Sequence, residues 1–349
     1  MATSSRDRIR AAREKMARGD ATEAEALAEE RRVAQAKREK QEARKIVRAL
    51  EQEVAQLEER QAYLDELASA PDPEPFVVTP KGKKHKGLQE ATYVALASDW
   101  HMGERVRPEN VGSRNEYDPS IAQERAHQFF ESNLILLNMA RQAWTIDQAV
   151  LWLGGDLMTG YIHEEYMEEN FLSPVEESLL VYETMVAGID FLLAKSDLRH
   201  ILVPTSNGNH GRTGKKIKIA SYAKNSFEWL LYQQLASHYR DEPRLEFRVA
   251  SGYHNVVDLY GLRVGFHHGD AIGYSGGVGG LSIPANRRFG RQAQAVPPRW
   301  EGTELAAPHL QCFGHFHQSL YPGSFICNGS LIGWNDFAER IGCPYEDPT

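Results

Sequence analysis

Side chains that can bind metals recur directly after apolar runs of strand length, and this pattern constrains the fold more than any other feature of the chain. The run at residues 92–97 ends just before Asp99 and His101, and the run at 148–153 ends just before Asp156. Five further residues follow later runs in the same way: Asn209, His210, His268, His315 and His317. A sheet whose strands end in one region would bring these side chains together.

Helical segments separate the first strand-like runs, near residues 119–141, 174–194 and 219–239. Shorter β-like runs follow at 245–249, 255–260 and 262–266, and an arginine-bearing loop (Arg287, Arg288 and Arg291) comes after them. Alternating strands and helices, followed by a strand-rich second half, predict an α/β domain with mixed sheets.

Asp, Asn and His side chains together supply the oxygen and imidazole ligands that suit Mn, Fe or Zn. The three cysteines, all after residue 310, fit no zinc spacing and give no disulfide framework. The candidate ligands suffice for two ions, with Asp156 as the natural bridge. Two ions about 3.5–4 Å apart can clamp an in-line phosphoryl displacement, so the sequence points to phosphoryl chemistry.

Purely structural interpretations remain open for several of these residues. Asp99 is compatible with a helix N-cap, and Asn209 with a turn residue in the left-handed conformation. Asp270 and His163 can either orient a ligand imidazole or be exposed without a role in the site.

The five clusters also occur in a recognisable order: D-x-H, G-D, G-N-H, H-G and G-H-x-H, across residues 93–328. In this order the chain resembles the calcineurin-like metallophosphoesterase superfamily. The resemblance implies a four-layer sandwich of two mixed sheets flanked by helices.

The resemblance also implies a role for each cluster. One metal would be held by Asp99, His101, Asp156 and His317. The second would be held by Asp156, Asn209, His268 and His315. His210 would stabilise the transition state or protonate the leaving oxygen, and the nucleophile would be a metal-bridging hydroxide. The expected ion is Mn²⁺, with Fe²⁺, Zn²⁺ and Ni²⁺ as alternatives.

One departure concerns the residue after the G-N-H histidine, where many superfamily members have Asp or Glu and this chain has Gly211 and Arg212. His210 must then be oriented by another group, or its role as an acid is reduced. Arg212 can instead bind a phosphate oxygen through its planar guanidinium. We count Arg212, His163 and Asp270 as candidate substrate-binding residues.

Gly-Arg after G-N-H is usual in a group of bacteriophage and prophage metallophosphoesterases similar to SbcD-type DNA-repair nucleases, which the segments at 98–103, 155–165 and 328–333 also resemble. The expected function is therefore phosphodiester hydrolysis, with DNA as substrate. DNA as the substrate is supported by the arginine-bearing loop and by a basic cluster, which consists of Lys81, Lys83, Lys84, His85 and Lys86. The net charge of −8 argues against DNA binding. Alternatives are a small-molecule or nucleotide phosphodiesterase or phosphatase, and a non-catalytic phage scaffold.

The stretch from residue 6 to 68 is rich in Ala, Glu, Arg, Lys and Gln, with Gly19 as its one glycine and no proline. This composition predicts a long helix. Its second half carries an a/d stripe, which consists of Val47, Leu50, Val54, Leu57, Gln61 and Leu64. The stripe favours a coiled coil that forms a homo-oligomer or recruits a partner protein. A solvated helix that packs on its own globular domain is the alternative.

Repeated prolines at residues 71–75 indicate a linker. The expected organisation is a helical appendage at 1–70, a Pro-rich then basic linker at 71–90, and a metallophosphoesterase domain at 91–349. The first residues are polar, no run is long enough to span a bilayer, and the cysteines are sparse. We expect no membrane association and a cytoplasmic protein, in the host cytoplasm if it is phage-encoded. The chain ends soon after Pro344, earlier than we expect for a fully closed second sheet.

Overall fold

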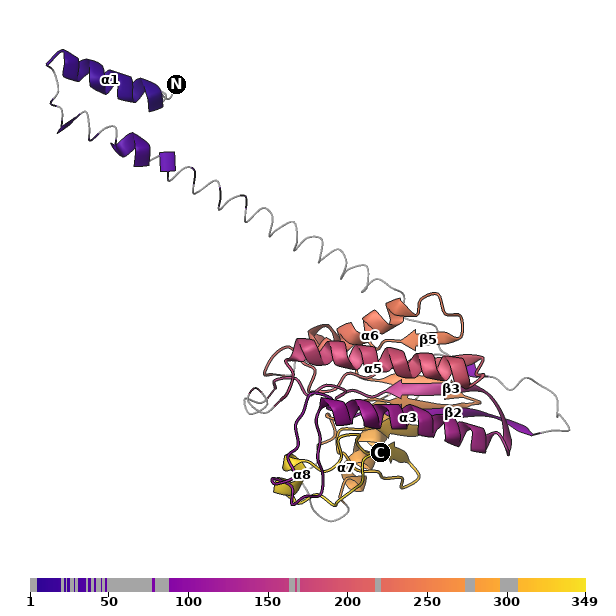
Figure 1. Ribbon diagram of the computed structural model, residues 1–349. Coiled ribbons are helices and arrows are strands. Elements are labelled where there is room, and N and C mark those ends of the chain that lie inside the picture. The colour runs from indigo at the N-terminus through magenta and orange to yellow at the C-terminus, as the bar shows by residue number, and fades with distance from the viewer. Residues whose placement is uncertain are drawn as a thin grey trace. The chain divides into compact units, whose positions relative to one another are not determined.

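Four parallel strands form the first sheet, and they pair in the order in which they occur in the chain (Figure 1). They are β2 (Gln89–Ala97), β3 (Trp144–Leu153), β4 (His200–Pro204) and β5 (Leu245–Arg248). The helices that connect them are α3 (Pro119–Ala140), α5 (Pro174–Lys195) and α6 (Phe227–His238). Because right-handed crossovers between neighbouring strands place every helix on the same face, α5 lies between α3 and α6 and contacts both.

Each crossover helix begins at a polar N-cap. The Asp118 carboxylate accepts hydrogen bonds from the first backbone amides of α3, directly before Pro119. Ser173 forms a capping box with Glu176 at the start of α5. The Ser226 hydroxyl caps α6. These side chains satisfy amides that the helix itself leaves unpaired.

The second sheet is mixed and runs in the order β1-β6-β7-β8-β9. Its strands are β1 (Val77–Val78), β6 (Asn255–Leu259), β7 (Leu262–Phe266), β8 (Leu310–Phe313) and β9 (Phe325–Cys327). Among the pairings of these named strands, only that of β6 with β7 is antiparallel, through a hairpin at Tyr260 and Gly261, which both have positive φ. Two further helices are α7 (Ser282–Ala295) and α8 (Asp336–Ile341).

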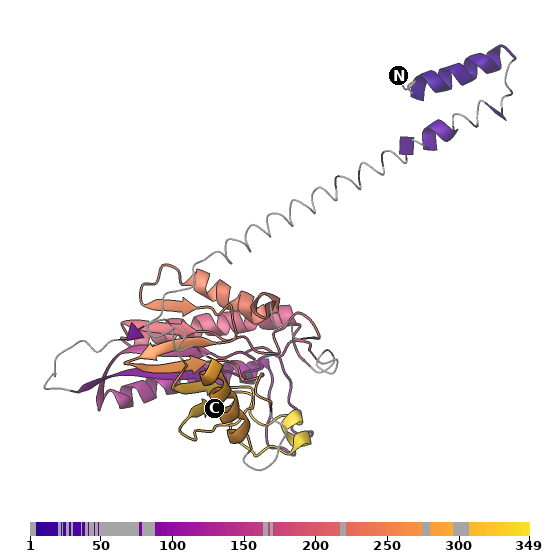
Figure 2. The same cartoon turned by 180° about the vertical axis from the view of Figure 1, so that it is seen from behind.

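Strand β3 lies inside the first sheet, between β2 and β4, and its second half is buried on both faces. Leu151 and Leu153 pack among the helices, whereas Val150 and Trp152 pack against Phe266 of the second sheet. On the outer side of the second sheet, residues of β8 and β9 pack with Ala285 and Phe289 of α7 (Figure 2). The prediction of an α/β chain with two sheets flanked by helices is confirmed. The prediction that both sheets are mixed is wrong, because all described pairings in the first sheet are parallel.

The computed structural model describes residues 5–19, 77–78, 88–162, 167, 170–216, 221–273, 280–295 and 307–349, with scattered positions between 22 and 48. The chain divides into two compact units, Met1–Pro73 and Glu74–Thr349. No helix within the described part is both long and apolar enough to cross a membrane.

The composition predicts one long helix over residues 6–68, but the first helix of the structure ends at Ala17. Helix α1 (Ser5–Ala17) ends before Gly19, whose φ of 77° is left-handed, and a Thr22–Glu25 capping box starts a new helical turn. Glycine adopts this conformation without steric cost and therefore terminates the helix. The predicted a/d stripe, the proline linker and the basic cluster at 81–86 lie outside the described residues.

Two further expectations need correction. Helix α6 begins at Phe227 rather than near residue 219, since a short 3-10 turn (Ala223–Asn225) and the Ser226 cap precede it. The arginines at 287, 288 and 291 lie on helix α7 and not in a loop.

A glycine on α5 allows this helix to approach α3 closely. A Cβ at Gly188 would overlap the ring of Phe130. We expect Gly188→Ala to lower the free energy of unfolding by about 1–3 kcal/mol, because the packed ring must move. Gly290→Ala in α7 is the matched control, since its Cβ would meet open space. Chemical denaturation would measure both, and equal stabilities of the two variants would contradict this account of the packing.

Candidate metal centre

The seven candidate ligands lie in loops that follow strands of both sheets. Asp99 and His101 follow β2, Asp156 follows β3 and Asn209 follows β4 in the first sheet. In the second sheet, one ligand follows β7 and two follow β8; these are His268, His315 and His317. Such loops at the carboxyl ends of strands are where α/β sheets hold ligands.

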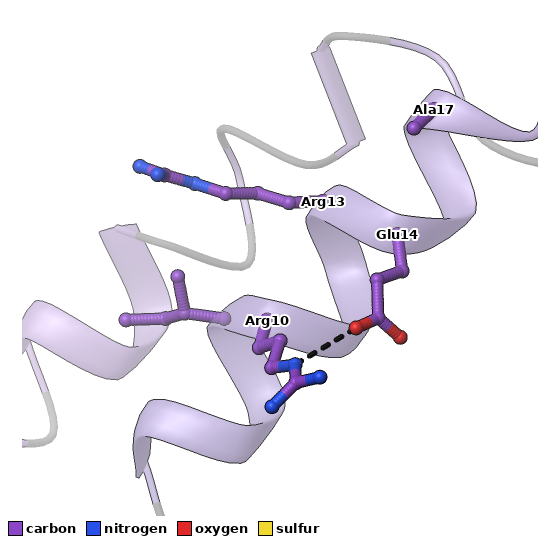
Figure 3. A pocket seen from close by; sticks show the side chains of 5 residues that line it. Arg10, Arg13, Glu14 and Ala17 are labelled. Atoms are coloured by element: carbon purple, nitrogen blue, oxygen red, sulfur yellow. Dashed lines mark hydrogen bonds and ion pairs between the residues drawn. The ribbon is translucent and has the colours of Figure 1, made fainter.

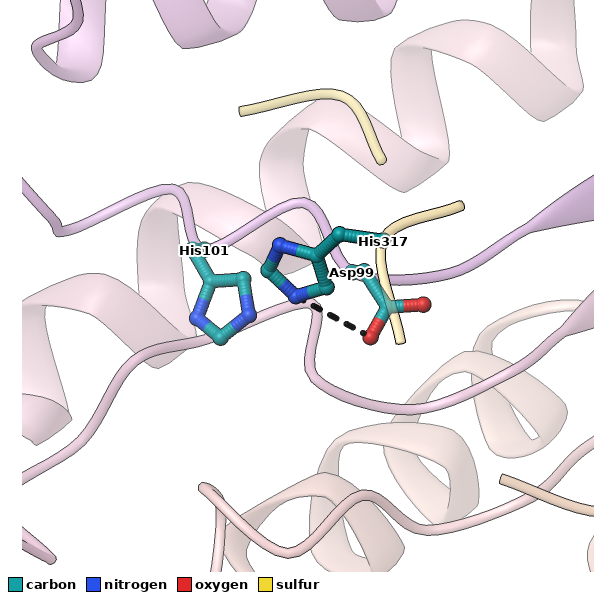
Figure 4. Close-up of side chains that lie close together, drawn as sticks. All are labelled: Asp99, His101 and His317. Carbon is teal, nitrogen blue, oxygen red and sulfur yellow. Dashed lines mark ion pairs between the residues drawn. The ribbon is translucent and has the colours of Figure 1, made fainter. Parts of the chain in front are cut away.

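The structure brings these side chains together in three overlapping groups. The first contains Asp99, His101 and His317 (Figure 4). The second contains His101, Asp156 and His210, and the third contains Asp156, His268 and His315. Within each group, the potential ligand atoms lie within 4.8 Å of one another. Asp156 belongs to two groups, as a bridging carboxylate would.

Five of the seven candidate ligands have a left-handed backbone, an unusual conformation for residues other than glycine. They are Asp99 (φ 59°), His101 (49°), Asp156 (50°), His315 (72°) and His317 (51°). This conformation costs roughly 1–2 kcal/mol per residue and persists only where the surroundings enforce it. Here the loops hold each other: the Asp99 amide donates to Gly155 O and the His101 amide donates to Asp156 O, both at 3.0 Å.

Glycines allow the carboxylates to lie directly against the backbone of other loops. A Cβ at Gly208 would overlap the carboxylate of Asp156, and a Cβ at Gly314 would overlap that of Asp99. Any larger residue in place of the glycines of the G-N-H and G-H-x-H motifs would collide with these carboxylates, and the sequence alone does not reveal this steric requirement.

Asp99 is fully buried, and burial raises the pKa of its carboxyl to about 7. Its two oxygens accept the backbone N–H of His315 at 2.9 and 3.0 Å, and Oδ1 lies 3.5 Å from Nε2 of His317. A buried carboxylate of this kind is stabilised in its charged form by a nearby cation.

His268 and Asp156 form the second half of the centre. Nδ1 of His268 donates to the Gly154 carbonyl at 2.9 Å, because a carbonyl oxygen can only accept. This bond turns Nε2 toward Asp156 Oδ2 at 2.9 Å and Asn209 Oδ1 at 3.2 Å. Burial lowers the pKa of His268, but the carboxylates of Asp156, Asp99 and Asp270 together outweigh it and raise that pKa well above its usual range.

Burial keeps the imidazoles of His101, His315 and His317 neutral, and the neutral form of histidine is the one that binds metals. Burial lowers the pKa of His101 well below its usual range, and neither of its ring nitrogens has a hydrogen-bond partner among the described residues. Burial also lowers the pKa of His315 to about 3 and that of His317 to about 4. Neutral imidazoles around two carboxylates form a donor set that fits divalent transition metals.

His210 is oriented by a backbone carbonyl instead of an acidic neighbour. Its Nδ1 lies 2.9 Å from Thr159 O and must donate to it, and its backbone amide donates to Asp156 Oδ1 at 2.7 Å. The ring packs edge-on against His101 with centroids 4.7 Å apart. The imidazole of His210 is therefore oriented even though no acidic residue follows the G-N-H motif.

The three candidate substrate-binding residues differ in their surroundings. The Arg212 guanidinium donates to the carbonyls of Asn209, Gly214 and Lys215, so its fork holds its own loop. Asp270 Oδ2 lies 3.5 Å from the Tyr222 hydroxyl, and Oδ1 is buried without a hydrogen-bond partner in the described part of the chain. His163 lies outside the described residues. Substrate binding by these residues stays a prediction.

The sequence analysis missed Glu104, which is buried beside the centre. Its Oε2 lies 3.7 Å from Nδ1 of His101, and its Oε1 accepts from Asn335 Nδ2 at 2.9 Å. The three-residue spacing from His101 is the only signal in the sequence, and Asn335 is 231 residues away.

A separate hollow lies on helix α1 in the N-terminal unit, lined by Ile9, Arg10, Arg13, Glu14 and Ala17 (Figure 3). The Arg10 guanidinium pairs with Glu14 at 2.8 Å across one helical turn, as surface charges commonly do. None of the candidate ligands contributes to this hollow.

No protein-family model matches the chain, and a search of curated proteins also finds no match.

Proposed function

We propose that this chain is a phosphodiester hydrolase that depends on two divalent metal ions, with Mn²⁺ as the expected ion, and that it belongs with the calcineurin-like metallophosphoesterases. The observation that carries the proposal is the set of three overlapping His/Asp groups, in which His101 joins the first to the second and Asp156 joins the second to the third. Their ligand types and burial, and the neutral imidazoles of His101, His315 and His317, suit two cations.

The residues divide into two ligand sets and one adjacent histidine. Asp99, His101 and His317 would hold one ion, and Asn209, His268 and His315 the other, with Asp156 shared. When bound, the ions would supply positive charge for the transition state and lower the pKa of a water molecule. His210, whose Nδ1–H donates to Thr159 O, would direct Nε2 at the reacting phosphate, and in its protonated imidazolium form Nε2–H would donate a hydrogen bond or a proton to the leaving oxygen.

DNA is the substrate that we propose for this site. Helix α7 carries three arginines and no acidic residue, in a chain of net charge −8. Its Arg288 donates to Ala271 O, three residues after His268, so positive charge lies close to the centre. Basic side chains can contact the backbone phosphates of DNA.

The test is an activity assay with Mn²⁺ on labelled linear duplex, single-stranded and circular DNA, beside bis-p-nitrophenyl phosphate. We expect cleavage of DNA and of the small diester, with both abolished by chelation of the metal. Cleavage of the small diester alone would contradict the nuclease assignment and favour a nucleotide or small-molecule substrate. No bound transition metal and no activity on any diester would favour a scaffold protein.

A further inference from the structure

Two buried glutamates outside the ligand set connect the loops that carry the ligands. Glu177 lies in the first turn of α5 and is fully buried. Its Oε1 accepts the amides of Gly103 and Thr159 at 2.7 and 2.6 Å, and its Oε2 accepts that of Gly160 at 3.0 Å. Gly103 follows His101 by two residues, so one side chain joins the loop after β2 to the loop after β3.

Glu228 makes the equivalent connection from the first turn of α6, and it is also fully buried. Its Oε1 accepts the amide of Leu157 at 2.7 Å, and its Oε2 accepts that of Gly208 at 2.6 Å. Leu157 follows Asp156, and Gly208 precedes Asn209. This glutamate therefore joins the two loops that supply Asp156 and Asn209.

Both positions require a carboxylate rather than any polar residue. A carboxylate is acceptor-only, so both of its oxygens can face backbone amides that have no strand partner. Hydrogen bonds to a charged acceptor are strong, and a helix N-terminus favours negative charge. The fit is close: a Cβ at Gly103 would come 2.6 Å from Cδ of Glu177, and one at Gly211 would come 2.7 Å from Cγ of Glu228.

We infer that Glu177 and Glu228 are positioning residues, and that they hold loops carrying different ligands of the metal centre. Glu228 places Asn209, which only the ion shared with His268 and His315 would use, and Asp156, which both ions would share. Glu177 places His101, and so governs the ion that would be shared with Asp99 and His317. This inference rests on the proposed function for the identity of the ligands.

Single-site backgrounds separate the two halves. His317→Ala leaves the second set of ligands, and His315→Ala leaves the first. In the His317→Ala chain, Glu228→Gln is expected to weaken Mn²⁺ binding in calorimetry by about 10-fold or more, and Glu177→Gln to weaken it less. In the His315→Ala chain, Glu177→Gln is expected to weaken binding through His101, and Glu228→Gln is expected to weaken it to a similar extent through the shared Asp156. Tyr239→Phe is the matched control, because it removes hydrogen bonds between α6 and α5 (to Val186 O and Asp190 Oδ1) that do not involve the ligand loops.

A measurement without metal tests the same connections independently. In hydrogen–deuterium exchange, Glu228→Gln is expected to speed exchange at Gly208 and leave Gly103 unchanged, whereas Glu177→Gln does the opposite. Equal changes at both amides in either variant, or none, would overturn the inference. A wild-type chain that binds no Mn²⁺ would overturn the proposed function and, with it, the role of both glutamates in metal binding. Binding of Mn²⁺ without the split between the variants would overturn this inference alone.

Discussion

Asp156→Ala is expected to abolish binding of both ions and to lower phosphodiesterase activity by roughly 10³-fold or more, because several kcal/mol of transition-state charge stabilisation is lost. The reason lies in the position of Asp156, which belongs to two of the three ligand groups and lies 2.9 Å from His268. Calorimetric titration with Mn²⁺ would measure the loss of binding, and hydrolysis of bis-p-nitrophenyl phosphate would measure the loss of activity.

Two further variants keep this result interpretable. Alanine is strained at the left-handed backbone of Asp156, whereas Asp156→Asn tolerates that conformation and removes only the charge. Asp147→Ala on the same strand removes a half-exposed carboxylate 3.6 Å from Arg199 and is expected to change neither binding nor activity. An Asp156→Ala chain that still binds two ions with wild-type affinity would show that the bridge is misassigned.

His210→Ala is expected to leave metal binding intact and to lower the rate of DNA hydrolysis by about 10²–10⁴-fold, the usual contribution of a positioned acid. Its imidazole is fixed by Thr159 O with Nε2 available for the leaving oxygen. The p-nitrophenolate group leaves without protonation, so hydrolysis of bis-p-nitrophenyl phosphate should fall much less if His210 is the acid.

The comparison of the two substrates distinguishes the two roles considered for His210. Equal losses on DNA and on the small diester would indicate electrostatic stabilisation of the transition state instead of proton transfer. Unchanged rates on both substrates would remove His210 from the mechanism. His127→Ala, which replaces an exposed histidine on α3 paired with Glu131, is the control and should have no effect.

Much of the second unit could be predicted from the sequence because its strands are buried on both faces. The central run at 149–153 is apolar throughout, since Val150 and Trp152 face one layer and Leu151 and Leu153 face the other. The N-caps at Asp118 and Ser173 likewise have local signatures. The break of the N-terminal helix at Gly19 was missed because a single glycine within a helical composition does not by itself determine the backbone conformation.

The glutamates illustrate what a local pattern cannot distinguish. Glu176 and Glu177 are adjacent acids in the first turn of α5, yet Glu176 caps its own helix and Glu177 is buried under two loops. Glu104 and Asn335 meet across 231 residues. Such pairings depend on how the helices pack on the sheet, which the sequence alone does not state.

By itself, the sequence determined which side chains could bind metal and that each follows a strand, because apolar runs and the polar residues after them are local features. Only the tertiary structure decided that strands from two sheets end in the same region, that Asp156 is shared between groups and that Thr159 O orients His210. The physical reason is that these contacts join residues that are distant in the chain, and their distances are set by the packing of one sheet against the other.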